Sequence, residues 1–218
     1  MPVITISRQF GAAGVPIGRR LAERLGAEFL DRAIVAQVAV RSGVPESELE
    51  LYDERLPSLW QRIASALANS SPEIAMPALS EAQLAQMPVH DRLVAVTRTV
   101  IEEAADRGNV VILGRGGAFI LGRRPSVLNV QLYASMDARI QYLQTWAEEA
   151  PGDMQPDKAS LRELCRSIDQ ARAEWVRRWF DADWMDLRHY DLSIDSGRFG
   201  VDGTIELIEW VARKEAAD

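Results

Sequence analysis

The sequence predicts an α/β protein with a doubly wound parallel sheet, in which ligands bind at the carboxyl ends of the strands. Three observations support this fold class. Short apolar runs of strand length alternate with longer stretches whose apolar residues have helical spacing. One run, residues 127–133, is mostly apolar, which is typical of a parallel strand buried on both faces. A glycine loop joins the first run to the first helical stretch.

Composition narrows the class of protein. The 218 residues suffice for one domain, and 47% apolar with 26% charged residues are ordinary globular proportions. No run approaches the ~18 to 20 apolar residues that span a bilayer. Because the N-terminus enters a strand pattern at once, we expect no secretion leader. The single cysteine, Cys165, cannot form an internal disulfide, so we expect a cytoplasmic protein. A net charge of −7 argues against nucleic-acid or anionic-membrane partners.

The N-terminal elements are predicted from their glycines and one proline. Residues 3–7 have the pattern of a strand, and Pro16 suits the first turn of a helix because its missing N–H costs nothing there. Gly26 ends that helix, and residues 27–30 follow as a second strand. The remaining expected elements are helices over 32–42, 93–104, 136–143, 158–180 and 205–211, and strands at 110–113, 127–133 and 191–195.

Two segments are expected to stand apart within a single domain of residues 1–218. Residues 44–89 contain several prolines, an acidic stretch and an Ala/Ser-rich stretch, which together predict a helical insertion that acts as a mobile flap. Pro151, Gly152 and Pro156 break the chain before the long helix over 158–180. We expect residues 151–190 to form a lid region around that helix.

The loop after the first strand predicts a phosphate site. A strand, a glycine turn and a helix N-terminus present backbone N–H groups to a phosphate, and the residues concerned are Gly11, Ala12, Ala13, Gly14 and Val15. The alternative is a plain turn, which would need fewer glycines. The loop lacks the lysine and the hydroxyl of the GxxxxGK(S/T) motif. Arg8, directly after the strand, is the candidate replacement for that lysine; the alternative is a surface ion pair.

Further arginines and one carboxylate follow other predicted strands. Arg115 lies among Gly114, Gly116 and Gly117 at the end of a central strand, where it is a candidate clamp for an acceptor phosphate. Asp31 ends the second strand, followed by Arg32. Asp31 could hold Mg²⁺ through water or cap the next helix, and the sequence leaves both alternatives open.

The long helix turns one arginine toward its apolar side. Arg172 falls near the centre of a stripe formed by Leu161, Cys165, Ile168, Trp175 and Trp179. Its partner is either a carboxylate such as Asp169 or a nucleotide phosphate, with Arg166, Arg177 and Arg178 adding charge as the lid closes. The tryptophans are read as core residues, with stacking on a base as the alternative. His90 and His189 lack metal-ligand spacing, so no metal site is expected.

Several motifs together resemble the cytidylate kinase-like proteins, a divergent branch of the P-loop nucleoside monophosphate kinases. The resemblance covers nearly the whole chain. The matching residues are the run from Ile4 to Gly11, Phe29-Leu30-Asp31-Arg32, the run from Gly108 to Gly116, Asp169, Arg172, Trp184 and Tyr190-Asp191-Leu192.

The resemblance implies a three-layer P-loop kinase fold with a five-stranded parallel sheet in the order 2-3-1-4-5, a helical acceptor-binding insertion and an arginine-bearing lid. It places Gly14 where cytidylate kinases have their phosphate lysine and Pro16 where they have the Mg²⁺ hydroxyl. Arg115 matches the arginine used on the acceptor, and Arg172 matches a lid arginine. The branch usually carries Arg-Glu where this chain has Val15-Pro16, so the protein departs from its nearest relatives.

We therefore expect a cytidylate kinase-like phosphotransferase that moves the ATP γ-phosphoryl to a small nucleotide such as CMP, with Mg²⁺ held mainly by the phosphates. Arg8 and Arg172 are the expected catalytic residues. The expected phosphate- and nucleotide-binding residues are Gly11, Ala12, Ala13, Gly14, Val15, Asp31, Arg32, Arg115, Arg166 and Arg177. A catalytically inactive nucleotide-binding sensor and a kinase for a non-nucleotide small molecule are the alternatives. A homodimer is left open.

Overall fold

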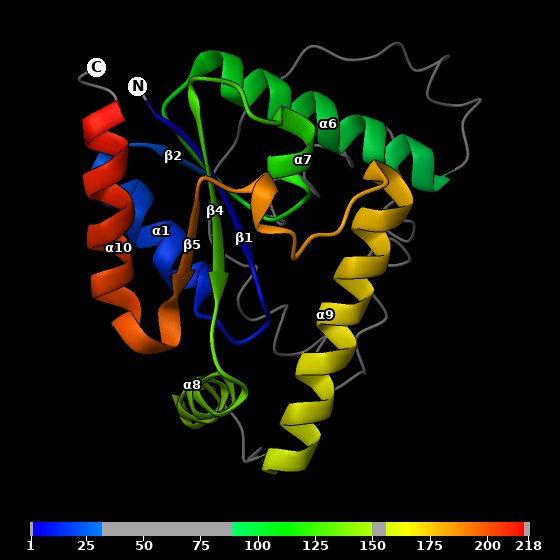
Figure 1. The fold of residues 1–218 in the computed structure, drawn as a ribbon, viewed down its shortest axis with the longest axis vertical. Helices are drawn as coiled ribbons and strands as arrows, with labels where there is room; N and C mark the ends of the chain where they lie inside the picture. The colour runs from blue at the N-terminus through cyan, green and yellow to red at the C-terminus, as the bar shows by residue number, and fades with distance from the viewer. Residues whose placement is uncertain (1, 32–88, 150–155, 216–218) are drawn as a thin grey trace.

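The computed structural model describes residues 2–31, 89–149 and 156–215, and its core is one parallel sheet of five strands (Figure 1). The strands are β1 (Val3–Arg8), β2 (Glu28–Leu30), β3 (Val110–Leu113), β4 (Val127–Tyr133) and β5 (Leu192–Asp195). Their order in the sheet is β2-β3-β1-β4-β5, which confirms the order 2-3-1-4-5. The helices are α1 (Gly14–Leu25), α6 (Val89–Arg107), α7 (Gly117–Leu121), α8 (Met136–Glu149), α9 (Lys158–Phe180) and α10 (Ser196–Glu215), with a short 3-10 turn, η1 (Leu187–His189).

The central strand β1 is buried on both faces, as its apolar sequence requires. It pairs in parallel with β3 and β4, so that Ile6 lies opposite Leu113 on one side and Val130 on the other. All three residues are 2% exposed or less, as expected for strands of a parallel sheet that is covered on both faces. The carboxyl ends of β1 and β3 consequently lie next to each other, where the two glycine loops begin.

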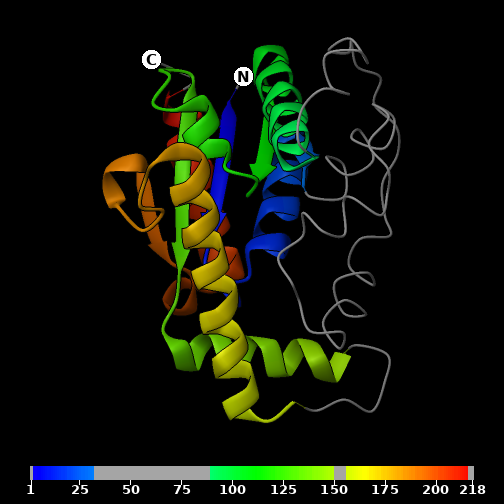
Figure 2. The ribbon, with the colours of Figure 1, turned by 90° about the vertical axis from the view of Figure 1, so that its right-hand side faces the viewer.

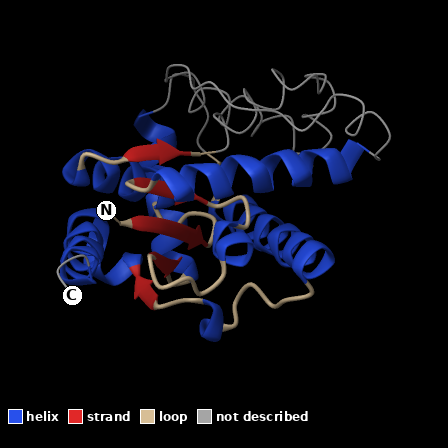
Figure 3. Cartoon of the chain, turned by 90° about the horizontal axis from the view of Figure 1, so that it is seen from above, coloured by secondary structure: helices blue, strands red, loops and turns tan. Residues whose placement is uncertain are grey.

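Helices cover both faces of the sheet and give three layers, as the views in Figures 2 and 3 show. On one face, α1 and α10 pack their buried Ile17, Leu21 and Ile205 against the strands. On the other face, α6 and α7 contribute an apolar cluster that includes Val100 and Ile120. This arrangement is the α/β P-loop kinase architecture expected above.

The helices α8 and α9 form a separate pair beside the carboxyl ends of the strands. They share a third apolar cluster of Ile140, Leu143, Leu161, Leu164, Cys165 and Ile168. In Figure 1, α9 runs from α8 to the far end of α6. The helix begins at Lys158 because Asp157 caps it, accepting the N–H groups of Ala159 and Ser160 at 2.8 and 3.0 Å.

Most element boundaries agree with the sequence patterns. The long helix over 158–180 is confirmed, and Gly26 ends α1 with a φ of +60°, as a C-terminal glycine does. Helix α7 and η1 were not predicted. The expected helix over 32–42 and the insertion at 44–89 lie outside the described residues. Among the helices that the structure describes, none combines the length and the apolarity that crossing a membrane requires.

Candidate functional site

The loop between β1 and α1 leaves several backbone N–H groups without an acceptor. Gly11 has a φ of +82°, and Ala13 precedes the helix with a φ of +53°. The N–H of Ala12 donates to Gln9 O at 3.2 Å, which closes the turn. Within residues 2–31, 89–149 and 156–215, the amides of Gly11, Ala13, Gly14 and Val15 donate to no acceptor. Such amides at a helix N-terminus suit an anion.

The loop rests directly on α8. A Cβ at Gly11 would lie 3.0 Å from Arg139 Cβ and 3.1 Å from the Arg139 carbonyl oxygen. Both the positive φ and this close approach favour glycine, because a side chain at position 11 would press on the backbone of α8. The loop and α8 are therefore in direct contact.

The side chain of Arg8 passes between the two glycine loops. A Cβ at Gly14 would lie only 2.7 Å from Arg8 Cγ, and a Cβ at Gly114 would overlap Arg8 Nη1 and lie 3.0 Å from Arg8 Cζ. The stem of Arg8 thus fills the space in front of Gly14, and its guanidinium lies against the loop that follows β3. A side chain at position 14 and the observed Arg8 conformation exclude each other.

The loop that carries Arg115 has an unusual backbone. Gly114, Arg115 and Gly116 have φ values of +73°, +54° and +71°, so a charged residue is held in a conformation that L-residues rarely adopt. The N–H of Gly114 donates to Ile6 O at 2.9 Å, which joins the loop to β1. Arg115 belongs to this loop and the Arg8 guanidinium contacts it at Gly114, so the loop brings the two arginines close together.

Aromatic side chains fix this loop from the side of α9. A Cβ at Gly116 would lie 2.9 Å from both Trp175 and Phe180. Phe119 stacks on Phe180 with ring centroids 5.5 Å apart and contacts His189 at 5.1 Å. Trp184 is 6% exposed. Trp175 and Trp184 therefore pack within the fold, which agrees with reading these tryptophans as core residues.

A buried charge network joins the first loop to α9. Arg139 of α8 is 4% exposed and donates from Nε to Phe10 O at 2.6 Å and from Nη2 to Asp169 Oδ2 at 2.5 Å. Asp169 in turn accepts the Phe10 N–H at 2.8 Å. Both polar groups of the Phe10 residue are thus held, one by each helix, so α8 and α9 together determine where the loop lies.

Arg172 belongs to the same network. Its Nη1 donates to Arg8 O at 2.9 Å and lies 3.6 Å from Asp169 Oδ1. The sequence predicted that this arginine points inward, and the structure confirms it with a side chain that is 17% exposed. It pairs with Asp169, which is the carboxylate alternative named above. A role on a phosphate remains a prediction.

Arg139 is the residue of this site that the sequence analysis missed. A signal was available, because Arg139 falls on the face of α8 that carries Met136, Ile140 and Leu143 at helical spacing. A charge on an apolar face indicates a buried partner, which here is Asp169.

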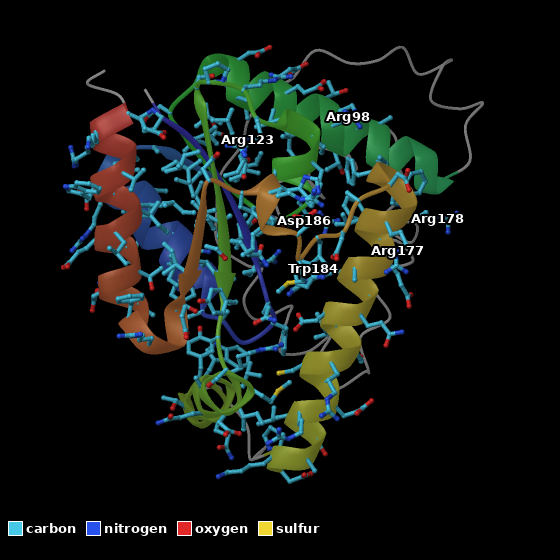
Figure 4. The ribbon with its side chains drawn as sticks, viewed as in Figure 1. Arg98, Arg123, Arg177, Arg178, Trp184 and Asp186 are labelled. Atoms are coloured by element: carbon cyan, nitrogen blue, oxygen red, sulfur yellow. The ribbon has the colours of Figure 1, made fainter. Side chains whose placement is uncertain are left out.

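The other predicted residues lie in different surroundings. Asp31 follows β2 and is half-buried, whereas Arg32 lies outside the described residues. Arg166 and Arg177 are exposed on α9. Figure 4 shows Arg177 and Arg178 at the end of α9, where Arg98 of α6 lies over the Phe180 ring at 6.0 Å. Across the described part of the chain, no three His, Cys, Asp or Glu residues gather in a group that could hold a metal ion.

Burial shifts the pKa of two side chains, Cys165 beside the network and Tyr190 beside Trp184. Burial raises the pKa of the Cys165 thiol, although the nearby Arg139 opposes the shift. Burial also raises the pKa of Tyr190 to about 12, and its hydroxyl donates to Trp184 O at 2.7 Å. Both side chains stay neutral at physiological pH, so Cys165 is a poor nucleophile.

Comparison with known proteins gives the family. Residues 3–198 match the model of the cytidylate kinase-like family. The chain belongs to this family. It is 30% identical over 135 residues to a cytidylate kinase from Methanoculleus marisnigri, a match that covers 60% of this chain and 68% of that relative.

Solved structures confirm the kinase fold. An uncharacterized protein from Eubacterium ventriosum has a TM-score of 0.63 at 16% identity, with 98% of this chain and 99% of that chain covered. Shikimate kinase from Bacteroides thetaiotaomicron has a TM-score of 0.52 at 13% identity, with 97% and 98% covered. At these identities the likeness concerns the fold alone. Together with the family, it supports a kinase-like phosphotransferase.

Proposed function

We propose that this protein transfers the γ-phosphoryl group of ATP to a small nucleotide such as CMP. The observation that supports the proposal best is the packing of Arg8 against Gly14, next to amides that suit a phosphate. Family membership implies the use of ATP, and the loop fits its phosphates because four N–H groups have no acceptor in the described part of the chain.

Each part of the site has a proposed task. The amides of residues 11–15 hold the donor phosphates, and Arg8 supplies the positive charge that a lysine at position 14 would otherwise supply. Arg115, on the loop that Arg8 contacts, holds the phosphate of the acceptor. Positioning and electrostatic stabilisation provide most of the catalysis in phosphoryl transfer, so a guanidinium in this place is sufficient in principle.

Arg172 is proposed as the second catalytic guanidinium. It reaches the strand end that carries Arg8, since its Nη1 donates to Arg8 O. The amide-rich cradle and the two arginines together would neutralise charge that develops on the transferred group. Mg²⁺ would be held mainly by the nucleotide phosphates, with Asp31 acting through water, because Pro16 has no hydroxyl to offer.

A panel of acceptors tests the proposal. The purified protein is incubated with ATP, Mg²⁺ and CMP, other nucleoside monophosphates or small hydroxyl compounds, and products are separated by chromatography. We expect CDP and ADP in equal amounts. Phosphorylation of a non-nucleotide acceptor alone would refute the proposed acceptor. Nucleotide binding without any product would instead support a catalytically inactive nucleotide sensor. The absence of a Mg²⁺-binding hydroxyl at Pro16 is the observation that favours this alternative.

An arginine at the amino end of a strand, opposite the end where the candidate site lies, provides a matched control. Arg124 lies before the start of β4, and its side chain is 44% exposed. Arg115→Ala should raise the KM for the acceptor far more than the KM for ATP, whereas Arg124→Ala should change neither. Equal effects of the two substitutions would remove Arg115 from the acceptor site.

A further inference from the structure

The outer face of α10 carries apolar side chains that no described element covers. Trp210 is 64% exposed, Phe199 is 48% exposed and Leu207 is 40% exposed. Between them lies Gly203, where an added Cβ would meet only Phe199 Cβ, at 3.5 Å. By their spacing, Gly203, Leu207 and Trp210 lie on one side of the helix. Phe199 precedes the break in the helix at Gly200, where φ is +68° and ψ is 179°, and it lies beside Gly203. We call these four residues the α10 face.

Residues on the opposite side of α10 pack against the sheet and hold the helix in place. Ile205 and Ile208 are fully buried and Ala212 is 1% exposed in the core cluster shared with the sheet. The α10 face is therefore not needed for the fold. Single exposed apolar residues are common on protein surfaces. Several that lie together, two of them aromatic, indicate a surface that binds another molecule.

One acidic and one basic residue lie beside the α10 face, at different points along the helix. Glu206 lies in its N-terminal half and Lys214 in its last turn, where Lys214 Nζ is 5.4 Å from the Trp210 ring. Within the described ranges neither residue forms an ion pair, whereas Asp202 pairs with Arg20 and Arg213 with Glu209. An antiparallel copy of α10 would bring Lys214 of each chain toward Glu206 of the other, twice by symmetry.

We propose that the α10 face binds a second copy of this chain, with the two α10 helices antiparallel about a two-fold axis between Leu207 and Trp210. In this arrangement Trp210 of each copy packs against Leu207 of the other, and Lys214 lies opposite Gly203, within one turn of Glu206. The charges complement each other only when the helices run in opposite directions, because a parallel pair would place Glu206 against Glu206. A second copy therefore fits this surface without any further partner.

The size of the α10 face predicts a weak dimer. With roughly 150 to 250 Å² for each aromatic side chain, the exposed fractions give about 300 Å² of apolar surface per copy. This area is well below the roughly 800 Å² per partner of a standard specific interface, so association should be weak and should depend strongly on concentration. In Figure 1, α10 lies at the edge of the molecule away from α9, so the pairing leaves the candidate site open.

Sedimentation equilibrium from micromolar to near-millimolar protein tests the proposal. The 24.3 kDa chain should approach twice its mass as concentration rises. Trp210→Glu and Gly203→Arg should keep the protein monomeric, while Leu187→Ser, which removes a 59% exposed apolar residue elsewhere, should not. Thermal unfolding checks that each variant is folded; Gly203 tolerates a side chain, since its surroundings are open.

Charge exchange distinguishes this pairing from any other. Glu206→Lys alone and Lys214→Glu alone should each weaken the dimer by at least several-fold, because each places like charges together. The double variant Glu206→Lys/Lys214→Glu should restore it, and a mixture of the two single variants should form a heterodimer. A monomer at every concentration, assemblies larger than a dimer, or no recovery in the double variant would overturn the proposal.

Discussion

Replacing Arg139 by methionine should destabilise the protein more than any other single change at the α8–α9 contact. Arg139 is 4% exposed and donates to Phe10 O, to Asp169 and to Cys165 O at 3.4 Å. Methionine can follow the course of the arginine stem as far as Nε but has no hydrogen-bond donor. The change would leave the Asp169 carboxylate, 16% exposed, with the Phe10 N–H at 2.8 Å and the more distant Arg172 at 3.6 Å.

The magnitude follows from the cost of breaking a buried ion pair. Removing one partner of such a pair costs about 3 to 5 kcal/mol, because the other charge stays buried. For a chain of 218 residues, each kcal/mol lowers the Tm by roughly 2 to 4 °C, so the expected decrease is about 6 to 20 °C. Arg162 offers a matched control, since it joins the same two helices through Asp137 at 3.3 Å but is 42% exposed. Arg162→Met should cost about 0 to 1 kcal/mol.

Urea unfolding followed by tryptophan fluorescence measures both variants. Arg139→Lys should lie between wild type and Arg139→Met, because a lysine cannot reach Phe10 O and Asp169 together with one planar group. A loss for Arg139→Met no larger than that for Arg162→Met would refute the reasoning. It would mean that the buried network does not hold the loop in place.

Three further predictions concern glycines and a tyrosine. Gly14→Ala should lower activity with little change in unfolding free energy, because alanine favours the helix while its Cβ displaces Arg8; activity equal to wild type would contradict this. Gly114→Ala, with a φ of +73° and a clash with Arg8, should destabilise by more than Gly26→Ala, where the φ is +60° and nothing lies within 4 Å; calorimetry compares the two. Because burial raises the pKa of Tyr190 from 10.0 to about 12, its contribution to stability is complete below pH 10.0 and is lost as the pH rises toward 12. The Tm difference between wild type and Tyr190→Phe should therefore shrink over that range, and a constant difference would count against it.

The sequence carried enough information to predict the sheet and the long helix. Residues 110–113 and 127–133 are apolar because their strands are buried on both faces, and that pattern is local. The sheet order came from the family resemblance, since pairing between distant strands leaves no local pattern. Helix α7 was missed because its five residues follow Gly116 at once and are too few to show a helical period.

Only those features of the candidate site that leave a local pattern could be predicted from the sequence. Glycines beside strand ends pointed to both loops, and the position of Arg172 on an apolar stripe pointed to a buried partner. Contacts between distant segments, such as Arg8 with Gly114 or Arg139 with Phe10, could not be predicted from the sequence. These contacts depend on how β1, β3 and α8 are placed relative to one another, which only the folded chain determines.

The rate of phosphoryl transfer by Arg8→Ala tests the central claim most directly, namely that Arg8 replaces the missing lysine beside the amide cradle. Measured at saturating ATP and acceptor against the Arg124→Ala control, Arg8→Ala should lower the rate by roughly 10³-fold or more. The double variant Arg8→Gly/Gly14→Lys should recover part of that loss, because it vacates the space that the arginine stem occupies and puts a lysine there. A rate for Arg8→Ala that equals the control would contradict the account.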